Sequence, residues 1–187
     1  MEGLAMTTHT NLYEIEATEL ARVGKYSAKE MVLSREKVRA LWDKLSQFRT
    51  LFSDLTQGDK GNFLRFITSE HSMWIEIFKD EIPVGIACFS NMEKVIDTDV
   101  HILFYDRQLS DKTEIGKAIV AWMFSNFPLQ RMTVEAARFY YATIRLAKDM
   151  GFKIEGEKRN AVLIGGRWSN SFILGITRQE VIEQCRS

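Results

Sequence analysis

Residues 101–118 read HILFYDRQLSDKTEIGKA, and this stretch decides the fold. Apolar and aromatic side chains predominate over residues 99–105 and predict a strand. A polar loop over residues 106–112 ends that strand, and apolar residues then recur at helical spacing over residues 113–125. We therefore expect a strand, a loop and a helix in succession.

The start of this predicted helix has the character of an anion site. A helix N-terminus presents unpaired amides and the positive end of the helix dipole, and Gly116 lacks a side chain that would block a close approach of the backbone. Residues 113–118 are therefore candidates for holding a pyrophosphate. The alternative is that Gly116 only allows the helix to pack closely against a neighbour.

Upstream of this stretch, helical spacing gives way to alternation. Ser34 is a suitable N-cap for a helix, and residues 63–67 predict a short helical turn. Alternating apolar side chains over residues 73–78, followed by a second run over residues 84–89, predict an antiparallel hairpin. The helix after Ser34 has one apolar face, made of Val38, Leu41, Trp42, Leu45, Phe48 and Phe52.

Downstream, strands and helices alternate. Residues 131–136 predict a strand, and residues 139–150 predict a helix that stops at Gly151. This order of elements predicts an α/β (α+β) fold, in which helices flank a mixed central sheet. Three further strand segments cover residues 152–156, 159–164 and 171–177, and Gly165 with Gly166 makes a tight turn between the last two.

Length and composition are those of one globular domain. The chain has 187 residues, of which 45% are hydrophobic and 27% charged, and it has only two prolines and no low-complexity linker. We expect a loose N-terminus over residues 1–10, a single domain over residues 11–178, and a solvated tail or short helix over residues 179–187. The first residues do not have the pattern of a signal peptide, so we expect a cytoplasmic protein.

Charge and motif content narrow the classes of function. Twenty-five Lys and Arg balance twenty-five Asp and Glu, so we expect neither a nucleic acid nor a membrane as a partner. The sequence has no Walker phosphate loop, no dinucleotide fingerprint and no closely spaced His, Cys and carboxylate set for a metal. Cys88 and Cys185 are far apart, and Cys88 lies in an apolar run that is typical of a buried thiol.

Two segments together resemble the GNAT superfamily of N-acyltransferases. The family's loop is written [Gln/Arg]-x-x-Gly-x-[Gly/Ala]; Gly116 and Ala118 match its last two fixed positions, whereas Thr113 replaces the first. Residues 146–156, LAKDMGFKIEG, resemble the family's ending Gly-Phe-x-x-Glu-Gly. The resemblance begins at about Trp74, and its divergence is similar to that of GNAT-like proteins encoded by bacteriophages.

The resemblance implies a fold and a cofactor. The sheet would be mostly antiparallel, with one pair of parallel strands that splay apart. Acetyl-CoA would be the acyl donor, and its pantetheine arm would contact the backbone of Leu103, Phe104 and Tyr105 in the gap between those strands. Its pyrophosphate would be held by the backbone amides of Thr113, Glu114, Ile115, Gly116, Lys117 and Ala118, and the Lys117 side chain offers a charge for a phosphate.

The residues that the family uses for proton transfer are replaced here. Tyr140 stands where the family often has an asparagine, and Ala147 stands where it carries a tyrosine acid for the CoA thiolate. The resemblance leaves Tyr140 and Tyr141 as substitutes for that acid, and packing or surface exposure is the alternative role for both. The usual acid is therefore missing from its position.

An amine that attacks a thioester must lose a proton, so a base is useful. Asp99, His101 and Glu135 are the candidates because they lie on the predicted central strands, and an imidazole titrates near neutral pH. His101 is alternatively a structural histidine, and Glu135 is alternatively an ion-pair partner of Arg131 or Arg138.

The resemblance thus implies an acetyl-CoA-dependent N-acyltransferase that acts on a primary amine of a protein or a small molecule. We expect direct attack on the thioester because no cysteine nucleophile with an adjacent base is evident from the sequence. Two alternatives stay open: a catalytically inactive GNAT-fold structural or interaction protein, such as a phage virion or assembly component, and a regulator that binds acyl-CoA. The acceptor and the oligomeric state are also open, a homodimer included.

Overall fold

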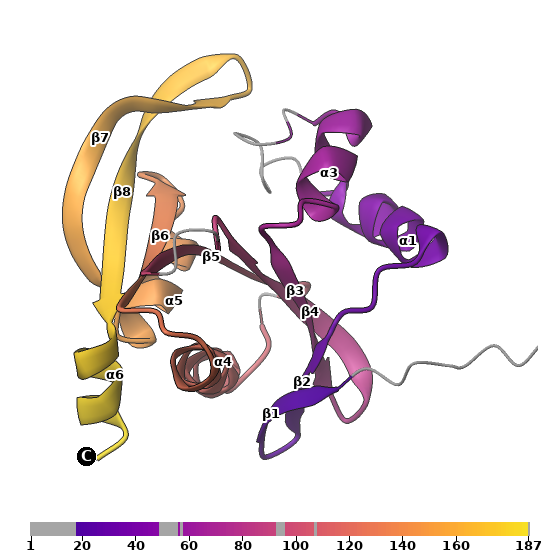
Figure 1. The fold of residues 1–187 in the computed structure, drawn as a ribbon. Helices are drawn as coiled ribbons and strands as arrows, with labels where there is room; N and C mark the ends of the chain where they lie inside the picture. The colour runs from indigo at the N-terminus through magenta and orange to yellow at the C-terminus, as the bar shows by residue number, and fades with distance from the viewer. Residues whose placement is uncertain (1–17, 49–55, 57, 93–95, 107, 187) are drawn as a thin grey trace, which may run out of the picture.

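The computed structural model describes residues 18–48, 56, 58–92, 96–106 and 108–186. Eight strands form one sheet in the order β1-β2-β3-β4-β5-β6-β8-β7, with helices on both of its faces (Figure 1). The strands are β1 (Glu19–Val23), β2 (Tyr26–Glu30), β3 (Met73–Lys79), β4 (Ile82–Ser90), β5 (Asp97–Phe104), β6 (Arg131–Ala137), β7 (Lys153–Ile164) and β8 (Arg167–Thr177). The helices are α1 (Arg35–Leu45), α3 (Lys60–Ile67), α4 (Lys112–Asn126), α5 (Tyr141–Asp149) and α6 (Arg178–Gln184).

The pairing of the strands confirms the predicted sheet. All neighbouring pairs are antiparallel except β5 and β6, which run parallel. The register of this pair consists of Asp97 with Arg131, Thr98 with Met132, and Asp99 with Thr133. β5 nevertheless continues to Phe104 and β6 to Ala137, so the two strands separate over their C-terminal halves, as expected for a splayed parallel pair.

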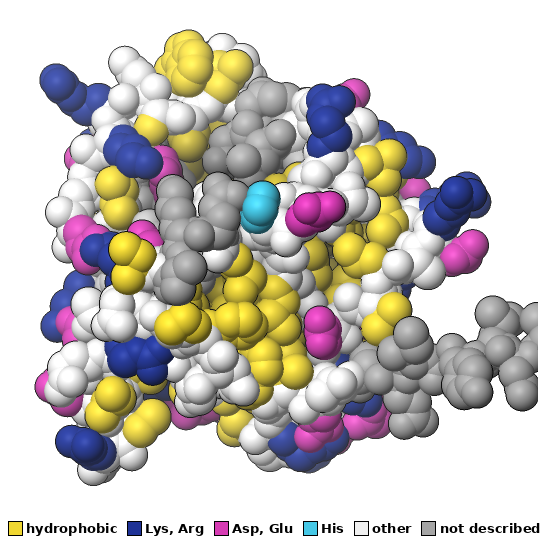
Figure 2. Space-filling model, viewed as in Figure 1, with side chains coloured by type: hydrophobic (Ala, Val, Ile, Leu, Met, Phe, Trp, Pro, Cys, Tyr) yellow, Lys and Arg dark blue, Asp and Glu magenta, His cyan; other side chains and the backbone are white. Residues whose placement is uncertain are grey.

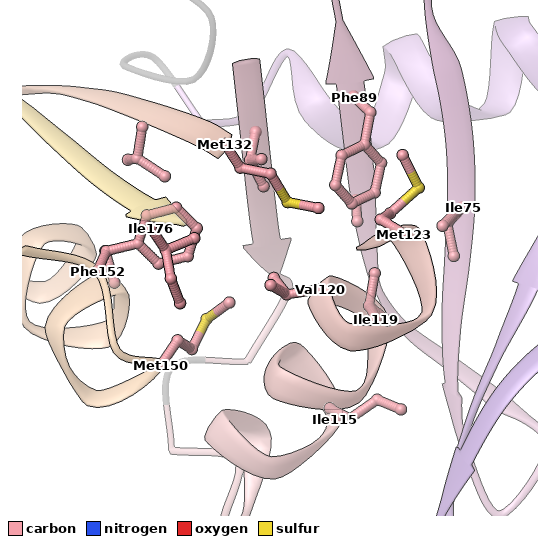
Figure 3. Close-up of a cluster of buried hydrophobic side chains, with 14 of the residues drawn as sticks. Ile75, Phe89, Ile115, Ile119, Val120, Met123, Met132, Met150, Phe152 and Ile176 are labelled. Atoms are coloured by element: carbon pink, nitrogen blue, oxygen red, sulfur yellow. The ribbon is translucent and has the colours of Figure 1, made fainter. Parts of the chain in front are cut away.

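The larger hydrophobic core, here called the main core, lies between the sheet and helices α4, α5 and α6. Side chains alternate along a strand, so Ile75 and Ile77 of β3 face this core together with Met132 of β6. From α4, Ile119 and Met123 point toward these strands (Figure 3). Because α4 follows β5 directly in the chain, its packing against the sheet positions the start of the helix beside the end of that strand.

A second core covers the opposite face of the sheet, under α1 and α3. As predicted, Ser34 caps α1, and its side chain accepts a hydrogen bond from the Lys37 amide at 3.1 Å. The apolar face of α1 is buried through Val38, Leu41 and Leu45. Of the other residues predicted for this face, Trp42 packs at the edge of the core, Phe48 is half-buried, and Phe52 lies outside the described residues.

The hairpin of β1 and β2 was not predicted, because residues 19–30, ELARVGKYSAKE, mix charged residues and helix-forming residues without a clear alternation. Gly24, at φ 55°, makes the turn, and β2 pairs with β3. Buried Tyr26 of β2 donates a hydrogen bond from its hydroxyl to the carbonyl of Ser110. The hairpin therefore fixes the loop that precedes α4.

The C-terminal hairpin is longer than its sequence pattern indicates. β7 is one strand of 12 residues. The sequence predicts two segments here because two register irregularities interrupt the alternation of side chains along this strand. The predicted turn at Gly165 and Gly166 is confirmed, with φ angles of 58° and 76°. Figure 1 shows this hairpin extending beyond the end of β6.

Residues 178–184 form the short helix α6, which resolves the choice between a tail and a helix for this segment. Thr177 and Glu180 make a reciprocal capping box, and Val181 is buried in the main core. Arg178 donates hydrogen bonds to the carbonyls of Leu129 and Phe127 at 2.8 and 2.6 Å. α6 is thus tied to the connection between α4 and β6. Residues 1–10, expected to be a loose terminus, lie outside the described residues.

Gly116 faces the end of α5. A Cβ atom built on Gly116 would lie 2.8 Å from the Sδ atom of Met150, whose side chain is buried in the main core. Real Cβ atoms do not come so close, so any side chain at position 116 would force the buried Met150 side chain to shift. The packing alternative therefore accounts for Gly116 without a ligand.

The longest described helix, α4, has 15 residues. Across the part of the chain that the structure describes, no helix combines the length and the apolar character needed to span a membrane.

The capping box predicts the contribution of α6 to stability. Replacing Thr177 with Ala removes the side chain that accepts a hydrogen bond from the Glu180 amide, and should lower the free energy of unfolding by about 1 kcal/mol, or the Tm by about 2–4 °C. Thr143→Ala, on an exposed position of α5, is the matched control and should change the Tm by less than half as much. Equal effects of both substitutions in thermal denaturation would contradict the capping role.

The contact with Met150 makes Gly116 sensitive to a single methyl group. Gly116→Ala should destabilise the protein by about 1–2 kcal/mol, because overpacking in a buried contact outweighs the gain in helix propensity. Met150→Ala should cost stability through a cavity, and the double variant should cost less than the sum of the two. Chemical denaturation checks this, and additive effects would show that the two residues do not compete for the same space.

Candidate active site

The site is built around the separation of β5 and β6. The last registered pair is Asp99 with Thr133, and beyond it the two strands present facing edges without mutual pairing. β5 keeps its pairing to β4 up to Phe104, and the Tyr105 amide donates to the carbonyl of Val84 at 2.9 Å. Of the predicted residues, Leu103 and Phe104 therefore lie along the open stretch of β5, with their opposite edge held by β4, and Tyr105 directly follows the end of this strand.

The N-terminus of α4 follows this stretch of β5. Its N-cap, Asp111, has a left-handed conformation with φ 58°, and its side chain makes no capping hydrogen bond to the first turn. The Glu114 amide donates a hydrogen bond to the Asp111 carbonyl at 3.1 Å, and the amide of Thr113 belongs to the first turn, whose amides an α-helix leaves without a partner of its own. With the positive end of the helix dipole, these amides suit an anion.

The six residues predicted at this helix start differ in their surroundings. Ile115 and Gly116 are buried against the main core, whereas Glu114 is exposed. Thr113, Lys117 and Ala118 are half-buried, and Lys117 pairs with Glu114 at 3.3 Å.

The three candidate bases, Asp99, His101 and Glu135, lie on one face of the sheet. Because side chains alternate, they share the face that is covered by α1 and α3, opposite the main core. Asp99 belongs to the last pair, and His101 and Glu135 are the next residues on this face of β5 and β6. These two side chains therefore flank the start of the opening.

Glu135 is held in an ion pair. Its carboxylate accepts hydrogen bonds from Lys158 at 2.6 Å and from the Ser171 hydroxyl at 2.5 Å. Neither arginine considered from the sequence is its partner: Arg131 pairs with Glu155 at 2.5 Å, and Arg138 pairs with Glu157 at 3.4 Å. Both oxygen atoms of the Glu135 carboxylate are therefore engaged by partners within the protein.

Asp99 and His101 have different environments. Asp99 accepts a hydrogen bond from the side chain of Asn91. His101 is half-buried, and its ring meets that of Phe66 edge-on, with 6.2 Å between the ring centroids. His101 thus combines a titratable ring, a position at the opening and partial shielding from solvent.

Cys88 lies directly across from His101 in the register of β4 and β5, on the same face. The sequence does not indicate this pair, because the two residues are brought together only by strand pairing. Burial raises the pKa of the Cys88 thiol well above its usual range. A buried thiol that stays protonated is a poor nucleophile.

The tyrosines at the start of α5 are placed differently from each other. Tyr140 is the N-cap of α5 and is half-buried, with its ring edge-on to Phe139 at 4.7 Å. Tyr141 is 76% exposed. Ala147, which replaces the acid of the family, is buried in the main core, so this position contributes packing.

One buried charge on this face was not predicted as a site residue. Glu76 of β3 is 9% exposed and accepts a hydrogen bond from Lys37 of α1 at 2.5 Å. Tyr105 is nearby, and burial together with the negative charge of Glu76 raises the pKa of its hydroxyl. The signal in the sequence is a lone acidic residue in the apolar run MWIEIF, residues 73–78.

The surface around these elements is mixed in character. Figure 2 shows hydrophobic side chains gathered in the middle of the view, between α4 and strands β3 and β4, with charged side chains around them. Within the ranges that the structure describes, His, Cys, Asp and Glu do not form a group of three that could hold a metal ion.

Solved structures share this architecture. A spermidine N-acetyltransferase from Vibrio cholerae, in complex with CoA and spermine, superimposes with a TM-score of 0.67 at 14% identity, over 84% of this chain and 98% of that chain. A ribosomal-protein-S5-alanine acetyltransferase from Vibrio fischeri gives 0.62 at 14% identity, over 86% and 96%. The microcin C7 self-immunity acetyltransferase MccE, in complex with acetyl-CoA and AMP, gives 0.64 at 12% identity, over 80% and 92%.

At these identities the structural likeness establishes the fold alone. No curated protein sequence matches the chain significantly. The family model described as acetyltransferase (GNAT) domain matches residues 43–173, which include β3 to β6, α4, α5 and most of the final hairpin. The chain therefore belongs to the GNAT acetyltransferase family.

Proposed function

We propose that the protein transfers an acetyl group from acetyl-CoA to an amine nitrogen by direct attack. The observation that carries this proposal is the opening between β5 and β6, which has the uncapped N-terminus of α4 after one strand and His101 at its start. The spermidine and ribosomal-protein acetyltransferases of the same fold act on amines, which supports an amine acceptor.

The residues present fit acetyl-CoA. The first-turn amides of α4 would hold its pyrophosphate, and Lys117 would add a positive charge nearby. The backbone of β5 at Leu103 and Phe104 would hold the pantetheine arm along the edge that β6 leaves open. When bound, acetyl-CoA supplies an acetyl carbon activated as a thioester, so that formation of the C–N bond breaks the C–S bond and releases the thiol.

The chain's own residues would move the protons of this reaction. His101 would take a proton from the attacking amine nitrogen, directly or through a water molecule. Tyr140, at the C-terminal end of β6, would give a proton to the leaving sulfur. Cys88 would stay protonated and unmodified, because burial disfavours its thiolate.

A second reading is supported by one observation. Ala147 is packed in the main core, so no acid occupies the position where the resemblance places one. A GNAT-fold protein without turnover would act as a structural component or as a regulator that binds acyl-CoA. Binding of acetyl-CoA without thiol release across a panel of amines would favour the regulator.

Binding of acetyl-CoA tests the role of the α4 N-terminus. Thr113→Glu puts a negative charge into the first turn of α4, where it should oppose a pyrophosphate and weaken binding at least about tenfold in calorimetry. Thr143→Glu makes the same charge change in the first turn of α5 and should bind like the parent protein. Absence of binding by the parent at near-millimolar acetyl-CoA would reject the cofactor proposal.

Substitution of His101 and of Cys88 tests direct attack. His101→Asn should lower kcat for acetyl transfer about 100-fold or more, because a general base contributes on this order. Cys88→Ala should keep most of the activity, and mass spectrometry of the parent with acetyl-CoA alone should show no acetylated cysteine. The exposed His71 provides the control variant His71→Asn. An inactive Cys88→Ala variant that still folds would favour a covalent acetyl-enzyme.

A further inference from the structure

Three side chains form a row across the sheet face that α1 and α3 cover. Trp74 of β3 pairs with Cys88 of β4, and Cys88 pairs with His101 of β5. Trp74 and Cys88 are buried in the second core, whereas His101 is half-buried. The row therefore has a large ring at one end, a small side chain in the middle, and the His101 imidazole at the end that lies beside the opening.

Phe66 of α3 packs onto this row. Its ring centroid lies 5.4 Å from that of Trp74 and 6.2 Å from that of His101, and its plane meets theirs at 75° and 87°. Two strand spacings, about 10 Å, separate the two ends of the row. These distances place the Phe66 ring between the other two rings, in the space that the small Cys88 side chain leaves over β4.

The helix that carries Phe66 is held in place by other residues. Asp59 caps the start of α3 by accepting a hydrogen bond from the Asn62 amide at 2.8 Å. Phe63 and Ile67, each 1% exposed, anchor the helix in the second core. Phe66 is only half-buried, so its ring adds to this anchored helix a contact with the half-buried His101.

His101 lies where neighbouring strands give its side chain little guidance. The register of β5 with β6 ends at Asp99 and Thr133, two residues before His101 is reached on this face. A side chain samples several rotamers unless its neighbours exclude them. Because the Phe66 ring occupies the space over Cys88, the imidazole cannot turn back over β4 and is left with the orientations that face the opening.

The orientation of a general base affects the rate directly. The base must hold its nitrogen within hydrogen-bond reach of the proton that it takes. A misplacement of about 1 Å, even one caused far from the reacting atoms, can lower a rate about 100-fold. A contact that selects one orientation of the imidazole therefore contributes to catalysis without touching the substrate.

We propose that Phe66 is a positioning residue, whose ring confines the His101 imidazole to the side of β5 that faces the opening. This inference rests on the proposed acetyl transfer, in which His101 takes a proton from the amine. Phe66 acts only through His101, and α3 thereby takes part in proton transfer.

Replacing Phe66 with leucine removes the ring and keeps an apolar side chain. In Phe66→Leu, kcat for acetyl transfer should fall about tenfold or more while KM for acetyl-CoA stays unchanged, because the base is misplaced and the cofactor site is not altered. Phe66→Tyr keeps the ring and should retain most of the kcat. A folded Phe66→Leu variant with the kcat of the parent would overturn the inference.

Phe63→Leu is the matched control on the same helix. The Phe63 ring packs against Trp42 of α1, with 5.3 Å between the ring centroids, and is more deeply buried than that of Phe66. Phe63→Leu should therefore lower the Tm at least as much as Phe66→Leu and leave kcat unchanged. Thermal denaturation shows that each variant is folded at the assay temperature. Equal losses of kcat in the two variants would show a structural effect of α3 and overturn the inference.

A double variant tests whether Phe66 acts through His101. In the His101→Asn background, Phe66→Leu should lower kcat no further, because the group that Phe66 positions is already absent. A loss of kcat of the same size in both backgrounds would overturn the inference. If His101→Asn alone kept the kcat of the parent, the assignment of His101 as the base would fail, and the role of Phe66 would fail with it.

Nuclear magnetic resonance of the imidazole tests the confinement without turnover. With isotope-labelled histidine, His101→Asn identifies the His101 signals among those of the three histidines of the chain. Three-bond couplings should show one χ1 rotamer of His101 in the parent and in Phe63→Leu, and an average over rotamers in Phe66→Leu. One unchanged rotamer in Phe66→Leu would overturn the inference. Confinement by Phe66 without thiol release from any amine would instead overturn the proposed function.

Discussion

The structure depends on the early end of pairing between β5 and β6. In a regular parallel pair, each backbone donor and acceptor on the shared edge finds a partner in the neighbouring strand. Here the register ends at Asp99 and Thr133 while both strands continue, so beyond these residues the two polar edges do not pair with each other. Such edges are costly when they are buried without partners, and they become useful when a polar ligand binds between them.

Packing on both faces of the sheet maintains this separation. On one face, α4 and the end of α5 meet at Gly116 and Met150, a contact so close that a side chain on the glycine would displace the Met150 side chain. On the other face, α1 and α3 cover β3, β4 and β5. The hairpin of β1 and β2 adds a third constraint, since Tyr26 fixes the loop before α4 through the carbonyl of Ser110. The opening is thus a product of the whole domain.

The polar residues of the site differ in the interactions that fix their charge state. Glu135 forms an ion pair with Lys158, and Glu76 forms one with Lys37. Cys88 is kept as a protonated thiol by burial. His101 shares their face and lies where the two strands separate. The proton transfers proposed for this protein therefore rest on His101 and Tyr140, whereas Glu135 and Glu76 are engaged in ion pairs.

Local pattern determined much of the fold from the sequence. The stretch of residues 101–118 predicted the strand, loop and helix that the structure contains, because alternation and helical spacing are local properties. The β1 and β2 hairpin escaped prediction, since its burial depends on β3, which is distant in sequence. Only the tertiary structure brought Cys88 opposite His101, paired Glu76 with Lys37, and filled the space at Gly116 with Met150. Each of these contacts joins residues far apart in the chain, so their distances follow from strand register and helix packing, which no local pattern encodes.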